Sequence, residues 1–72
     1  MKKINKAKIK INGKKCTINS KMTLKKLITR FKIPLDKVAI ELNENIIDKK
    51  KLDKIKVNNN DQIEIVHFIG GG

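Results

Sequence analysis

The chain has 72 residues, a length that fits one domain with a thin hydrophobic core and leaves little room for a deep catalytic cleft. Its formal net charge of +11 is of the kind found in nucleic-acid-binding proteins. However, Arg30 is the only arginine among the 18 basic residues, and phosphate and base recognition favour arginine. Lys, Ile and Asn, which all have A/T-rich codons, fill more than half of the chain. We therefore attribute the charge to composition and expect no nucleic-acid partner.

The scarcity of reactive residues excludes several kinds of site. Cys16 is the only cysteine and His67 the only histidine, so neither an internal disulfide nor a metal site is expected. No apolar run approaches the ~18–20 residues that span a bilayer. No catalytic triad, phosphate-binding glycine loop or metalloprotease motif is present. We expect a soluble, cytoplasmic protein that is not an enzyme, binds no cofactor of its own and has no membrane partner.

Residues 7–18 read as a β-hairpin. Asn12-Gly13 is a strong signal for a type I′ turn, which needs positive φ at both central residues. That turn places Ile9 opposite Cys16, with the apolar side chains on one face and lysines on the other. Cys16 is therefore expected to be a small buried hydrophobic residue.

Residues 23–32 read as a helix that begins at the N-cap Thr23. Leucine, isoleucine and phenylalanine recur at helical spacing up to Phe31, so Phe31 is expected in the core. Pro34 is expected to end the helix.

The second half of the chain predicts three more strands. The expected elements are a strand over 38–42, a short strand at 46–47, a helical turn within 48–56, a turn at 58–61 and a last strand over 62–69. The order β-β-α-β-β-(short helix)-β, with one helix packed across one face of a mixed sheet, is an α+β architecture. It is the β-grasp arrangement of ubiquitin-like proteins, here a single domain over residues 1–72.

The last strand leads into a glycine tail. Its alternation directs Ile63 and Ile65 to the core and Val66 and Phe68 to the other face. An exposed aromatic beside an exposed aliphatic side chain is typical of a docking patch. We therefore expect the segment Val66, His67, Phe68 and Ile69 to dock partner proteins. His67 faces outward or fills the rim of the core.

The tail, Gly70-Gly71-Gly72, is the candidate reactive segment. Three consecutive glycines cannot serve stability, because glycine loses the most conformational freedom on ordering. They form a flexible arm without side chains that can thread a narrow channel. A carboxylate at Gly72 would be ionised at neutral pH and could attack the α-phosphate of ATP if an enzyme positioned both.

The sequence resembles the ThiS family of thiamine-biosynthesis sulfur carrier proteins. Two stretches carry the resemblance, residues 38–43 (VAIELN) and residues 61–72 (DQIEIVHFIGGG). It departs from the family pattern in turns and packing positions, such as Glu44 and Asn60 where members often have glycine, and Leu52 where they often have tryptophan.

The resemblance implies a mechanism. An E1-like adenylyltransferase of the ThiF type would adenylate Gly72 with ATP, and sulfur from a cysteine desulfurase-derived persulfide would convert it to a thiocarboxylate, a 1-thioglycine. A thiazole synthase of the ThiG type would then take the sulfur into the thiazole ring. Gly70 and Gly71 would supply reach.

Three alternatives remain open on the residues alone. One is a small subunit of the molybdopterin synthase type, which shares the fold and the activation chemistry. Another is a basic β-grasp RNA-binding module, and the third is a ubiquitin-like modifier linked through Gly72 to lysines.

Overall fold

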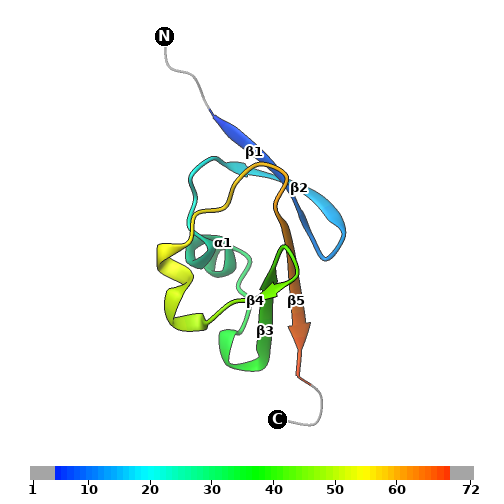
Figure 1. The fold of residues 1–72 in the computed structure, drawn as a ribbon, viewed down its shortest axis with the longest axis vertical. Helices are drawn as coiled ribbons and strands as arrows, with labels where there is room; N and C mark the ends of the chain where they lie inside the picture. Colours follow the sequence, from blue (N-terminus) through cyan, green and yellow to red (C-terminus); the bar gives the residue numbers. More distant parts are fainter. Residues whose placement is uncertain (1–4, 69–72) are drawn as a thin grey trace.

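The computed structural model describes residues 5–68. Five strands form one mixed sheet in the order β2-β1-β5-β3-β4, with α1 lying across one face (Figure 1). In chain order the elements are β1 (Lys6–Ile11), β2 (Lys14–Asn19), α1 (Leu24–Arg30), η1 (Leu35–Lys37), β3 (Val38–Leu42), β4 (Asn45–Ile46), η2 (Lys49–Lys54) and β5 (Gln62–His67). β1 and β5 run parallel at the centre of the sheet, and the other neighbours are antiparallel. The expected β-grasp architecture is confirmed.

The β1–β2 hairpin has the predicted register. Ile9 lies opposite Cys16, and the turn residues Asn12 and Gly13 have φ of 50° and 81°. Both values are positive, as a type I′ turn requires. The lysines of β1 are exposed and its apolar residues face the helix, so the turn and the alternation agree. Cys16 is half-buried rather than fully buried.

Helix α1 starts where the sequence indicates and ends earlier. The Thr23 side chain accepts a hydrogen bond from the Lys26 N–H at 3.1 Å. At the other end Lys32 adopts φ of 56°, its N–H donates to the Thr29 carbonyl, and the Ile33 N–H donates to the Ile28 carbonyl. This pair of bonds is a Schellman motif, so the chain reverses two residues before Pro34.

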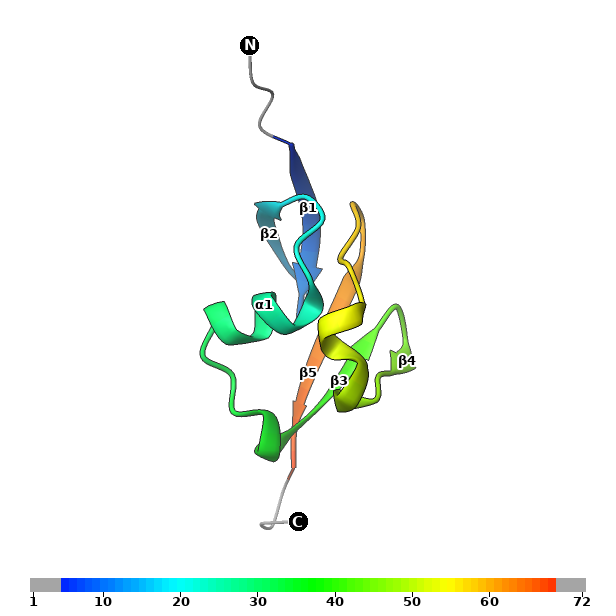
Figure 2. The same ribbon diagram turned by 90° about the vertical axis from the view of Figure 1, so that its left-hand side faces the viewer.

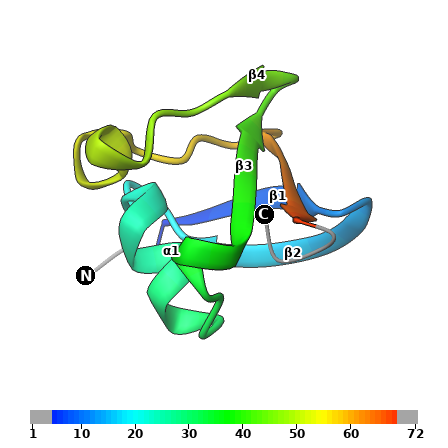
Figure 3. The same ribbon diagram turned by 90° about the horizontal axis from the view of Figure 1, so that it is seen from below.

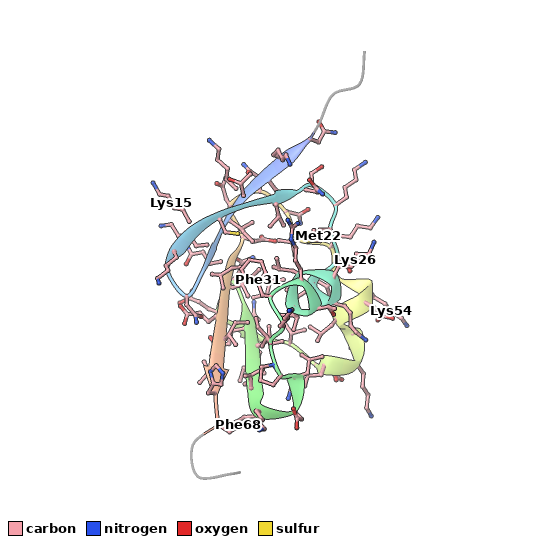
Figure 4. All side chains as sticks on the ribbon, turned by 180° about the vertical axis from the view of Figure 1, so that it is seen from behind. Lys15, Met22, Lys26, Phe31, Lys54 and Phe68 are labelled. Atoms are coloured by element: carbon pink, nitrogen blue, oxygen red, sulfur yellow. The ribbon has the colours of Figure 1, made fainter. Side chains whose placement is uncertain are left out.

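The early helix end makes one expectation wrong. Phe31 is not a core residue: its side chain is 45% exposed. It occupies the C-cap position, where the backbone leaves helical geometry, so it no longer continues the apolar stripe. Its ring lies beside the hairpin and, with Ile11 and Cys16, lines an open hollow (Figure 4).

The second half of the chain follows the expected elements with small shifts of boundary. β4 covers Asn45–Ile46 instead of residues 46–47, and η1 was not expected. The β3–β4 turn has positive φ at Asn43 and Glu44, 50° and 71°. In the turn expected at 58–61, Asn60 also has a positive φ, 71°.

The core lies between the sheet and the two helical segments α1 and η2, which occupy the same side of the sheet (Figure 3). Its buried apolar residues are Ala7, Ile9, Ile18, Leu24, Leu27, Ile28, Val38, Ile40, Leu52, Val57, Ile63 and Ile65. Leu52 anchors η2 in this core and is 0% exposed. Across residues 5–68 no helix has the length and hydrophobicity needed to cross a bilayer.

Candidate functional site

The candidate site is the end of β5. The start of β1 and the end of β5 lie at opposite ends of the long axis of the molecule (Figure 2). Val66 and Phe68 are 45% and 49% exposed on this end, as the alternation of the last strand predicts. His67 is also exposed. Ile69 and the glycines Gly70, Gly71 and Gly72 lie outside the described residues.

Asn12 holds β5 in place just before the exposed segment. The Asn12 Oδ1 accepts a hydrogen bond from the Ile65 N–H at 2.7 Å, and its Nδ2 donates to the Ile65 carbonyl at 3.4 Å. The Asn12 N–H also donates to the Ile63 carbonyl at 2.8 Å. The side chain thus continues the ladder between β1 and β5 by one step after β1 has ended. The hairpin turn is therefore hydrogen-bonded to β5 just before the exposed segment.

Beyond Ile65, β3 is the only strand in the described part of the chain that pairs with β5. Ala39 pairs with Val66 and Val38 pairs with His67, and the Phe68 N–H donates to the Lys37 carbonyl at 2.9 Å. These contacts fix the direction in which the chain leaves the sheet. The exposed segment is therefore held by hydrogen bonds up to Phe68, and we call Val66, His67 and Phe68 the docking platform.

Lys49 of η2 adds a contact with the ring of Phe68. Its Nζ lies 5.3 Å from the centroid of the Phe68 ring and donates a hydrogen bond to the Leu35 carbonyl. A cation at this distance from a ring face is attracted to it. The Lys49 side chain therefore links η2, η1 and the end of β5, and it orients the ring that we expect to dock partners. Within its run of three lysines, nothing in the sequence singles out Lys49.

The start of β5 is fixed by a polar network around the buried Asp61. One Asp61 carboxylate oxygen accepts from the Asn43 side chain at 3.0 Å, and the other accepts from the Asn58 N–H at 2.7 Å. Asn43 also accepts from the Gln62 N–H at 2.9 Å. The β3–β4 turn is thereby tied to the beginning of the last strand, so β5 is held at both ends.

The end of β5 presents apolar side chains beside the exposed His67. Between residues 5 and 68, no three His, Cys, Asp or Glu side chains gather in a way that could hold a metal ion. Cys16 lies on the hairpin, and Val66 and Phe68 offer apolar surface only. Such a platform can bind a protein and present the segment that follows it.

Comparison with known proteins decides the family. The model of the ThiS family matches residues 3–72, nearly the whole chain and its three terminal glycines included. The chain belongs to the ThiS family. The sulfur carrier protein ThiS of Bacillus subtilis is 36% identical over 50 residues, which cover 69% of this chain and 76% of that protein. The family match supports the expectation of a carrier rather than an enzyme.

A solved structure and a second kind of relative extend the ThiS family comparison. The crystal structure of the thiamine biosynthesis protein ThiS from Geobacter metallireducens superposes with a TM-score of 0.81 at 26% identity, covering 90% of this chain and 99% of that one. The thiazole synthase of Paramagnetospirillum magneticum is 38% identical over 65 residues, which cover 90% of this chain. The chain spans 20% of the length of that synthase.

Proposed function

We propose that this protein is a sulfur carrier of thiamine biosynthesis whose reacting group is the carboxylate of Gly72. The observation that carries the proposal is the ThiS family match, because it extends through the terminal glycines. The geometry supports it: the exposed docking platform at the end of β5 directly precedes the tail in the sequence. On this proposal the folded domain binds the partner enzymes and the tail extends to their active sites, where the partner enzymes catalyse the reaction.

The proposed reaction has three balanced steps. The Gly72 carboxylate attacks the α-phosphate of ATP and displaces pyrophosphate, which gives an acyl-adenylate. The terminal sulfur of a cysteine persulfide then attacks the acyl carbon and displaces AMP. The product is an acyl disulfide between Gly72 and the cysteine of the sulfur-donating enzyme. Finally a second thiol attacks that cysteine sulfur, which releases the thiocarboxylate of Gly72 and leaves a disulfide on the enzyme. The tip glycine has no side chain to obstruct the attack on the acyl carbon.

Three partners follow from these steps. An E1-like adenylyltransferase of the ThiF type activates the tail, a cysteine desulfurase generates the persulfide, and a thiazole synthase of the ThiG type consumes the thiocarboxylate. The relatives named thiazole synthase support the last of these, since a segment similar to this chain makes up a fifth of each. Persulfide and thiolate chemistry needs reducing conditions, so we place the reaction in the cytoplasm.

The same tail chemistry would serve a carrier of the molybdopterin synthase type. The matches to the ThiS family and to proteins named for thiamine biosynthesis favour the thiamine branch. A carrier is regenerated in each cycle and remains a co-substrate rather than a catalyst.

ATP–pyrophosphate exchange with the cognate adenylyltransferase tests the proposal. Wild-type protein is expected to support exchange, and a variant with one alanine added after Gly72 is expected to support none. A variant with an extra residue at the N-terminus is the matched control and should behave as wild type. Equal exchange with the C-terminally extended variant would rule out Gly72 as the reacting residue.

A further inference from the structure

The acidic residues are confined to one part of the chain. All seven lie at or beyond Asp36, whereas the basic residues occur throughout. In the described residues before Asp36, which form β1, β2 and α1, every charged side chain is basic. Basic and acidic residues nearly balance over the rest of the chain. The net charge of +11 is therefore carried by the part of the chain before Asp36.

Three of these lysines gather on the outer face of the sheet. Lys8, Lys10 and Lys15 are exposed on the side away from α1, and we call them the lysine face. They line an open hollow of about 540 Å³ together with Thr17, Asn60 and Gln62. Asp61 also lines the hollow, but its carboxylate is engaged by Asn43 and Asn58.

The pairing within the lysine face is unfavourable for folding. Lys10 and Lys15 lie directly opposite each other on β1 and β2. Like charges in that arrangement destabilise a sheet. An anionic surface placed over the hollow would remove this repulsion, so the lysine face is better suited to the bound state than to the free one.

The lysine face and Val66 of the docking platform share one side of the sheet. Lys10 pairs with Gln62 of β5, and Val66 lies four residues further along the same face of that strand, with the exposed Glu64 between them. At about 3.3 Å per residue, roughly 13 Å separates the two positions along β5. A standard protein interface covers about 800 Å² on each partner, which spans more than this distance. One partner seated on Val66 and Phe68 would therefore also reach the lysine face.

The side chains of this face indicate a protein rather than a nucleic acid. Its cations are lysines, its remaining polar groups are Thr17, Asn60 and Gln62, and none of these stacks on bases as aromatic side chains do. Lysine provides charge without the bidentate geometry of arginine. Charges at the rim of an interface mainly accelerate association and set orientation.

We propose that the lysine face is a second half of the partner-docking surface, which binds an acidic patch on the adenylyltransferase beside the contacts of Val66 and Phe68. This inference rests on the proposed function, because it names a further contact with the enzyme that activates Gly72.

Two matched triple variants test the proposal. The first replaces Lys8, Lys10 and Lys15 by glutamine, and the second replaces Lys50, Lys51 and Lys54 of η2 by glutamine. Both remove three exposed positive charges, and Lys54 lies on the opposite side of the molecule from Lys15 (Figure 4). The measurement is the KM and kcat of ATP–pyrophosphate exchange at low and high salt.

The first triple variant is expected to raise KM roughly tenfold at low salt with kcat unchanged, since electrostatic steering changes association rates by tenfold or more. The KM of the second triple variant is expected to stay within twofold of the wild-type value. The difference should vanish near 1 M salt, where the Debye length is about 3 Å. Removing the Lys10–Lys15 repulsion should not lower stability, and thermal unfolding checks this.

Equal KM changes in both variants would show an effect of net charge alone and overturn the proposal. An unchanged KM in the first variant would overturn it as well. Titration of labelled single-stranded RNA is the second arm: RNA binding lost only in the first variant, with KM unchanged, would assign the lysine face to nucleic acid. Absence of exchange with wild-type protein would instead refute the proposed function.

Discussion

Phe68 provides the sharpest test of the docking platform. A phenylalanine side chain offers about 150–250 Å² of surface, so with 49% exposed roughly 100 Å² is free for a partner to cover. At about 25 cal/mol per Å² this area corresponds to about 2.5 kcal/mol of binding free energy. Since each 1.4 kcal/mol is tenfold, Phe68→Ala should raise the Kd for the adenylyltransferase by up to roughly 60-fold. Isothermal titration calorimetry measures this directly.

Phe31→Ala is the matched control for Phe68→Ala. Phe31 is 45% exposed at the C-cap of α1, well apart from Phe68 (Figure 4), so it offers the same side chain with nearly the same exposure away from the platform. Its Kd should stay within twofold of wild type. Both variants must be shown to be folded by circular dichroism, because Phe68 also has a buried half. An equal loss of affinity in the two variants, or none in Phe68→Ala, would refute the docking role of Phe68.

Three further predictions concern stability and are measured by urea unfolding. Asn12→Gly keeps the positive φ of the turn but removes both bonds to Ile65, so it should cost about 1–3 kcal/mol and speed amide exchange at Ile65; an unchanged exchange rate would contradict the anchoring role. Leu52→Ala should cost about 2–5 kcal/mol, a large share of the total for so small a domain, because Leu52 is fully buried; a cost under 1 kcal/mol would mean that η2 contributes little to the core. Glu44→Gly should stabilise by about 0.5 kcal/mol, since relief at φ of 71° exceeds the entropy cost of glycine; destabilisation would show that the Glu44 side chain makes a favourable contact.

Much of the fold could be predicted because local and tertiary signals agree. Asn12-Gly13 determines the turn and hence the register of the hairpin, and the structure has that register. Thr23 caps the helix as its position suggests. The alternation of β5 correctly places Ile65 inside and Phe68 outside. In each case one residue type suits one backbone geometry.

The errors arise where the backbone adopts a geometry that the residue does not signal. Lys32 takes a left-handed conformation normally occupied by glycine, so the helix ends early and Phe31 is exposed. Glu44 likewise occupies a turn position that favours glycine. The hydrogen bonds that accompany the turn at Lys32 are made by backbone atoms, so the type of residue does not reveal them.

The contacts that shape the candidate site also depend on the folded arrangement. Asn12 is recognisable as a turn residue, but its bonds to Ile65 exist only because β1 and β5 are neighbours. The same adjacency places Lys10 on one face with Val66. The contact of Lys49 with Phe68 joins η2 to the end of β5. Strand order, rather than local pattern, creates this site.

The most direct test of the central claim is the intact mass of the protein after reaction. Wild-type protein is incubated with the cognate adenylyltransferase, ATP, a cysteine desulfurase, cysteine and a reducing thiol. The account predicts that one oxygen is replaced by one sulfur, that fragmentation locates the change at Gly72, and that omitting ATP abolishes it. An unchanged mass under conditions in which the same enzymes modify another ThiS family protein would contradict the account.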